Sequence, residues 1–177
     1  LEARDQAHTS GFPRAETNIL GNIGYMYAQL GRIEEGVPYF EESVNKAIEL
    51  GMSRERGYYT TNLADAYYAL GKKDEAIKML DENAEVINEN PAPMMSAAMT
   101  RAQYVKDAGD LKGAYTLTEE QLRLAESRGI REHQRELSRQ LRDLAKEMGD
   151  FDAYVKYNEM AMTLEKELDS TQAARAL

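Results

Sequence analysis

The chain has 177 residues, of which 42% are hydrophobic and 30% are charged, and its net charge is −9. This composition is typical of one folded domain and excludes a largely disordered chain, while the absence of cysteine excludes disulfides and cysteine-bound metal sites. The negative charge argues against direct binding to nucleic acid, and no apolar run is long enough for a membrane span. We therefore expect a cytoplasmic protein. Because residue 1 is leucine, not methionine, we also expect a piece of a longer protein.

Glycine recurs along the chain in steps of 20 residues. It occupies positions 11, 31, 51 and 71, and then positions 109, 129 and 149. Only the step from 71 to 109 differs, and Pro91 stands in that gap where the series would place a glycine. Glycine ends helices because it takes a left-handed backbone conformation without steric cost. The spacing therefore predicts helices joined by short glycine turns.

Apolar residues between these glycines recur every three to four positions, as Leu20, Ile23 and Tyr27 do, and no segment alternates as a strand would. The sequence therefore predicts an all-α protein. Helix pairs that repeat at a fixed period stack into a solenoid. We expect helices over residues 14–30, 33–50, 54–70, 73–89, 92–108, 111–128, 131–148 and 151–175. These form one domain over 1–177, with four pairs at 14–50, 54–89, 92–128 and 131–175, and residues 1–10 as the tail of a preceding helix.

Two stretches of the chain share the same set of large and small residues. The first has Leu20, Ile23, Gly24, Tyr27, Gly31, Gly36 and Phe40, and the second has Leu63, Ala64, Tyr67, Gly71, Ala76 and Leu80. This pattern resembles the tetratricopeptide repeat. The third pair matches it weakly, and the fourth has Arg142 and Tyr154 at small-residue positions, which suits a terminal repeat that caps the stack.

The resemblance implies a right-handed α-solenoid of antiparallel helix pairs, with about four repeats and a partial N-terminal helix. The step from Gly31 to Gly71 makes each repeat about 40 residues long, whereas the common length in this family is about 34. The long form is similar to regulatory domains of bacterial signalling proteins such as sensor kinases, nucleotide cyclases and transcription activators. In those proteins the last helix often continues into an effector, and residues 151–177 are the candidate for such a helix.

No motif in the sequence indicates catalysis or a bound cofactor. Gly31 and Gly36 have the spacing of a phosphate-binding loop, but Val37-Pro38 follows them in place of Lys-Ser or Lys-Thr. The two histidines, His8 and His133, have no partner ligand three or four residues away. We therefore expect a protein that is not an enzyme, with no metal and no cofactor.

The family resemblance places the first helix of each pair on a concave binding surface. The inward positions that it implies are Asn18, Asn22, Tyr25, Gln29, Tyr58, Asn62, Asp65, Tyr68, Met99, Gln103, Lys106 and Arg139. Asn22 and Asn62 hold the same place in successive repeats, and a side-chain amide can both donate to and accept from a peptide backbone. Hydrogen bonding of the two asparagines within the scaffold is an equal alternative, and for the tyrosines packing is favoured over binding.

Four arginines lie three or four residues apart on one expected helix, at Arg131, Arg135, Arg139 and Arg142. They form either a solvated face of mixed charge, which is favoured, or a contact for an acidic segment or another copy. The sequence thus favours a protein- or peptide-binding module in a signalling protein, without direct contact to nucleic acid or membrane. The alternative is a structural protein that either self-associates or spaces other domains, with no ligand in its groove.

Overall fold

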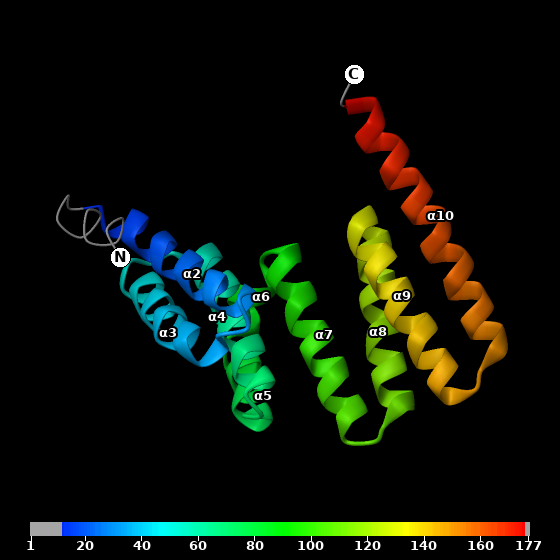
Figure 1. The fold of residues 1–177 in the computed structure, drawn as a ribbon, viewed down its shortest axis with the longest axis horizontal. Coiled ribbons are helices and arrows are strands. Elements are labelled where there is room, and N and C mark those ends of the chain that lie inside the picture. Colours follow the sequence, from blue (N-terminus) through cyan, green and yellow to red (C-terminus); the bar gives the residue numbers. More distant parts are fainter. Residues whose placement is uncertain (1–11, 176–177) are drawn as a thin grey trace. The chain divides into compact units, whose positions relative to one another are not determined.

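The computed structural model describes residues 12–175, with side chains described through Thr171. Within this range every regular element is an α-helix, which confirms the all-α prediction (Figure 1). The expected tail of a preceding helix, residues 1–10, lies outside the described residues. The helices are α2 (Pro13–Gln29), α3 (Ile33–Glu49), α4 (Ser53–Ala69), α5 (Lys73–Glu82), α6 (Ala84–Asn88), α7 (Pro91–Asp107), α8 (Leu111–Ser127), α9 (Arg131–Met148) and α10 (Phe151–Arg175).

Two compact units make up the chain, residues 1–100 and residues 101–177. In the first unit α2 packs on α3, α3 packs on α4, and α4 packs on α5 and α6. In the second unit α8 packs on α9, and α9 packs on α10. Consecutive helices joined by short turns form antiparallel pairs, and each helix buries its apolar side against its neighbours in the series.

The glycines predicted from their spacing end helices. Gly31 and Gly51 have φ angles of 72° and 63°, a region that favours glycine. The amide of Arg32 donates to the carbonyl of Tyr27 at 2.9 Å, closing the last turn of α2 as in a Schellman motif. Glycines 71, 109, 129 and 149 also have positive φ angles. The glycine series between 31 and 149 is therefore a series of helix caps, while Gly11 lies outside the described residues.

Small residues allow paired helices to approach closely. A Cβ atom on Gly24 of α2 would lie 2.8 Å from the ring of Phe40 in α3. In the next repeat, Ala64 and Ala76 are fully buried in one cluster with Leu80. The small residues quoted for the repeat pattern thus serve the close packing expected of them.

One expected helix is broken. The sequence predicts a single helix over residues 73–89, but the structure has α5 and α6 there, separated at Asn83, so this prediction is wrong. The Asn83 side chain donates to the carbonyl of Met79 at 2.9 Å and accepts from the guanidinium of Arg56 at 2.6 Å. An asparagine that bonds to a nearby backbone carbonyl competes with helix continuation, and Arg56 of α4 holds this side chain in place.

Candidate binding surface

The first helices of the repeats in unit 1 form a surface that we call the first-helix surface. Its residues come from α2, α4 and the part of α7 before residue 101. Adjacent helices of this surface contact each other, since α2 packs on α4 and side chains of α4 bond to α7. The surface consists of Asn18, Asn22, Tyr25, Gln29, Tyr58, Asn62, Asp65, Tyr68, Ser96 and Met99, all of which are exposed or half-buried.

Asp65 connects two helices of this surface. Its carboxylate accepts hydrogen bonds from the hydroxyl of Ser96 at 2.6 Å and from that of Thr100 at 2.5 Å. Burial raises the pKa of Asp65, and the two hydroxyl donors act in the opposite direction because they favour the charged form. Both carboxylate oxygens are therefore engaged in joining α4 to α7.

Asn18 is also engaged within the scaffold. The hydroxyl of Tyr59 donates to its side-chain oxygen at 2.9 Å. The Tyr59 ring packs directly on the backbone of Gly21. A Cβ atom added at Gly21 would lie within 2.2 Å of this ring, so only glycine leaves room for it. Burial raises the pKa of Tyr59 to about 12. The sequence did not identify Tyr59 as part of this surface, although it follows Tyr58 directly.

Asn22 and Asn62 differ from these residues because neither side chain bonds to another residue in the range 12–171. Asn22 is exposed and Asn62 is half-buried. Tyr25 and Tyr58, on the same helices, each expose about half of their surface. The free amides of the first-helix surface thus stand among aromatic side chains, and each amide retains its donors and its acceptor.

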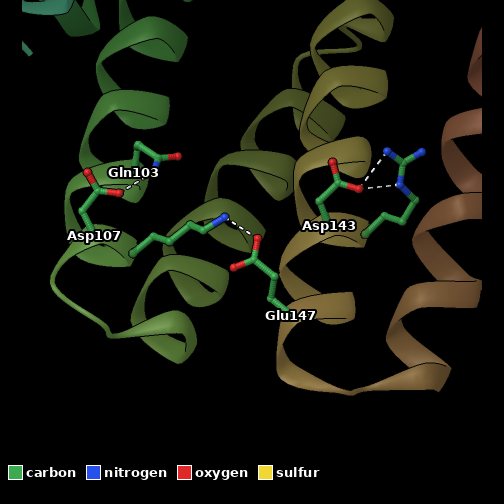
Figure 2. Close-up of polar contacts among 6 residues, drawn as sticks. Gln103, Asp107, Asp143 and Glu147 are labelled. Atoms are coloured by element: carbon green, nitrogen blue, oxygen red, sulfur yellow. Dashed lines mark hydrogen bonds and ion pairs between the residues drawn. The ribbon is translucent and has the colours of Figure 1, made fainter. Parts of the chain in front are cut away.

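The predicted inward residues of unit 2 are held by charged contacts (Figure 2). Lys106 pairs with Glu147 of α9 at 2.5 Å, and the Gln103 amide donates to Asp107 at 2.6 Å. A hollow of about 170 Å³ beside them is lined by Ala102, Gln103, Lys106, Gln140, Asp143 and Leu144. The polar groups around this hollow largely satisfy one another, except for the buried side-chain oxygen of Gln140.

The arginine residues of α9 mostly pair with carboxylates of the same unit. Arg139 bonds to Glu165 of α10 at 2.6 Å, and Arg131 lies 3.5 Å from Glu167. Arg142 pairs with the neighbouring Asp143 at 2.8 Å. The Nε atom of Arg135 is buried and has no partner in the described range. The contacts of Arg139 and Arg131 join α9 to α10. A role of these arginines in binding an acidic partner remains a prediction.

A larger groove lies on the second helices of unit 1, where no sequence pattern predicts a binding site. It has a volume of about 590 Å³ and runs between α3, α4 and α5. The Tyr67 hydroxyl donates to Glu41 at 2.6 Å along its wall, and this bond contributes to a Tyr67 pKa of about 12. The buried hydroxyl of Thr60 lines the groove without a described partner. Charged helix residues line its rim, and their sequence pattern is the same as that of an ordinary solvent-exposed helix face.

No cluster of three or more histidine, aspartate or glutamate side chains in the described part of the chain has the arrangement of a metal site. None of the helices described is both long and apolar enough to cross a bilayer.

Comparison with solved structures shows the same fold in several helical repeat proteins. BtubC (BKLC) from P. vanneervenii is 18% identical with a TM-score of 0.71, and the match covers 89% of this chain and 66% of that chain. A putative kinesin light chain of Podosopora anserina with TPR-like repeats is 18% identical with a TM-score of 0.62, covering 88% and 77%. The Rap conjugation gene regulator of plasmid pLS20, in complex with a Phr peptide, is 14% identical with a TM-score of 0.65, covering 98% and 56%.

This chain therefore spans just under two thirds of the BtubC chain and a little over half of the Rap chain. Comparison with curated proteins found no match. Stacked antiparallel helix pairs define the chain as an α-solenoid repeat protein. The tetratricopeptide repeat model matches residues 16–85, so this part of the chain is similar to that family. Such repeats are protein-interaction modules.

Proposed function

We propose that the chain is a non-catalytic regulatory module of a bacterial signalling protein in the cytoplasm, and that unit 1 binds an extended protein or peptide segment. The segment lies across the first-helix surface and contacts Asn22 and Asn62. Support for a peptide ligand comes from the repeat family and from the fold shared with a regulator that was solved with a bound peptide. Support for the signalling role is the long repeat form, and the 25-residue α10 is suited to connect to an effector.

The observation that carries the proposal is the contrast between two pairs of polar residues on one surface. Asn18 and Asp65 are engaged by Tyr59, Ser96 and Thr100. Asn22 and Asn62, by contrast, have no partner in the described range. A scaffold role would give the half-buried amide of Asn62 a partner, because buried polar groups that stabilise a fold are hydrogen-bonded. Free amides at equivalent positions of two successive repeats are suited to form hydrogen bonds with the backbone of a bound peptide.

The spacing of the two amides matches an extended chain. Packed helices lie about 8–10 Å apart, and Asn22 and Asn62 occupy equivalent positions on the neighbouring helices α2 and α4. An extended strand advances about 3.3 Å per residue, so these amides would meet peptide groups about three residues apart. Tyr25 and Tyr58 would supply apolar area with little loss of side-chain entropy.

Charge contributes little to this recognition. Asp65 is the one carboxylate among the residues that define the first-helix surface, and two hydroxyl groups already engage it. The proposed surface therefore recognises a backbone and apolar side chains, not a charge pattern. Its affinity should depend weakly on ionic strength, because few exposed charges face the ligand.

A peptide library displayed on phage tests the proposal. Selected peptides would be synthesised, and their dissociation constants measured by fluorescence anisotropy against wild type, Asn22→Ala and Asn62→Ala. Each variant should lose a hydrogen bond in a desolvated site, which weakens binding by about 1–3 kcal/mol, or roughly five- to 150-fold. Matched controls are Asn45→Ala and Asn88→Ala, which make the same change at exposed positions of α3 and α6.

Equal affinity of all five proteins for every selected peptide would refute the proposed site. If Asn22→Ala or Asn62→Ala unfolds the protein, the asparagine belongs to the scaffold. The alternative function, a spacer or self-associating scaffold with an idle surface, would be supported if no peptide is enriched and the chain sediments as a dimer.

A further inference from the structure

The outer face of α2 is apolar and exposed. We define it by Phe12, Ile19, Ile23 and Met26, which follow one another at spacings of seven, four and three residues along the helix. Phe12 is 65% exposed and Met26 is 62% exposed, while the two isoleucines are half-buried. A continuous apolar stripe at helical spacing with little cover is unusual for a solvated face, because large apolar patches generally mark an interaction surface.

The equivalent face of α4 is buried. A step of 40 residues carries the four positions of α2 to Met52, Tyr59, Leu63 and Ala66. Met52 is only 4% exposed and Ala66 only 5%. The same face is therefore covered in α4 and exposed in α2. The element that covers this face of α4 indicates what kind of element would fit the outer face of α2.

In α4 this face is covered by α3, the second helix of the preceding repeat. Phe40 of α3 packs with Leu63 and Ala66, and Ala47 packs with Met52 and Tyr59. Early residues of α3 thus meet late residues of α4, and late residues meet early ones, so the two helices run antiparallel.

We propose that the outer face of α2 docks an amphipathic helix of the same chemistry as α3, running antiparallel to α2. Its apolar residues would repeat the spacing of Val37, Phe40, Val44 and Ala47. Because Met26 is larger than its equivalent Ala66, the docking helix needs a smaller residue than phenylalanine at the position that corresponds to Phe40. The proposed interface continues the α3–α4 interface by one repeat, and none of the four residues that define it belongs to the first-helix surface.

The helix α10 of a second copy does not fit this description. In repeat alignment α10 corresponds to α3, but it has Asn158 in the place of Phe40 and Glu165 in the place of Ala47. Glu165 is already paired with Arg139 at 2.6 Å. Docking this face of α10 on the outer face of α2 would bury polar groups against apolar ones, which is costly without hydrogen-bond partners.

A synthetic helix tests the proposal directly. The probe is a fluorescent peptide with the sequence of residues 32–50, Phe40 replaced by leucine, and a hydrocarbon bridge between positions 41 and 45, which are exposed in α3. We expect saturable binding to the full chain by anisotropy. Met26→Glu should weaken it at least about tenfold, because a carboxylate would enter an apolar contact. Met162→Glu, at a methionine that is 51% exposed on α10, is the matched control and should leave the affinity unchanged.

Circular dichroism and melting curves would show whether both variants remain folded. No saturable binding to wild type, or equal affinity of wild type and Met26→Glu, would overturn the proposal. Sedimentation velocity separates a second copy from a distinct helix. A dimer of the chain alone that dissociates in Met26→Glu would show that this face is a self-association surface, and would overturn the assigned occupant.

Discussion

Gly36 of α3 lies directly against the backbone of Gly24 in α2, so that a Cβ atom at position 36 would come within 2.8 Å of the Gly24 carbonyl oxygen. A backbone oxygen inside a helix cannot rotate away as a side chain can. Gly36→Ala should therefore overpack the interface and lower the free energy of unfolding by about 1–3 kcal/mol. This outcome opposes the usual gain from replacing glycine by alanine within a helix.

Urea denaturation of Gly36→Ala and wild type measures the effect. Asn45→Ala is the control, since Asn45 is exposed on the same helix and its change should stay within about 0.5 kcal/mol of wild type. Unchanged or increased stability of Gly36→Ala would mean that α2 and α3 can separate at little cost, against the packing described above.

Asp65 should make stability depend on pH in a defined direction. Burial raises its pKa in the folded protein, so protonation favours the folded state. The stabilisation of the folded state by protonated Asp65 is fully present below the unfolded-state pKa of about 3.9. It is lost as pH rises through the higher folded-state pKa. The stability of Asp65→Asn relative to wild type should therefore increase between pH 4 and pH 7.

Urea melts at intervals across this pH range provide the measurement. Asp169→Asn makes the same change at an exposed aspartate of α10, and its pH-dependent difference should be smaller. A difference for Asp65→Asn that stays flat or falls as pH rises would show that the hydroxyls of Ser96 and Thr100 outweigh burial.

The hydrogen bond between Tyr59 and Asn18 should be measurable as a coupling energy. A double-mutant cycle of Tyr59→Phe and Asn18→Ala is expected to yield about 0.5–1.5 kcal/mol, the net value of a typical hydrogen bond. The same cycle with Asn22→Ala should give a value near zero, because Asn22 has no partner in the described range. Coupling of Tyr59 to Asn22 but not to Asn18 would contradict the assignment of the scaffold and ligand asparagines.

Protection from hydrogen exchange should decline near the end of α10. Leu168 is the last buried side chain within the described range, and residues 169–171 are exposed. Amides after Asp169 should exchange quickly, because few buried contacts resist local opening there. Leu168→Ala should move the fast-exchanging region towards Leu164. Strong protection to the end of α10 in a monomer would indicate a cap, and in a dimer it would indicate a coiled-coil connection.

Residue types and spacing alone were enough to predict most of the fold. The glycine steps and the period of the apolar residues predict eight helices, and seven of them match the structure closely. The reason is that helix formation and helix ending are local. The cap at Gly31, for example, depends on its own φ angle and on a bond between Arg32 and Tyr27.

Contacts between distant parts of the chain decided two features, the break in the fourth expected helix and the roles of the polar residues. Asn83 breaks the helix expected over residues 73–89, and its partner Arg56 is 27 residues away. Asn18 and Asn22 have identical side chains one helical turn apart, and only the position of Tyr59, 41 residues from Asn18, makes one of them structural. Local backbone preferences are present in the sequence itself, whereas the partners of a polar side chain arise only when the repeats pack against one another.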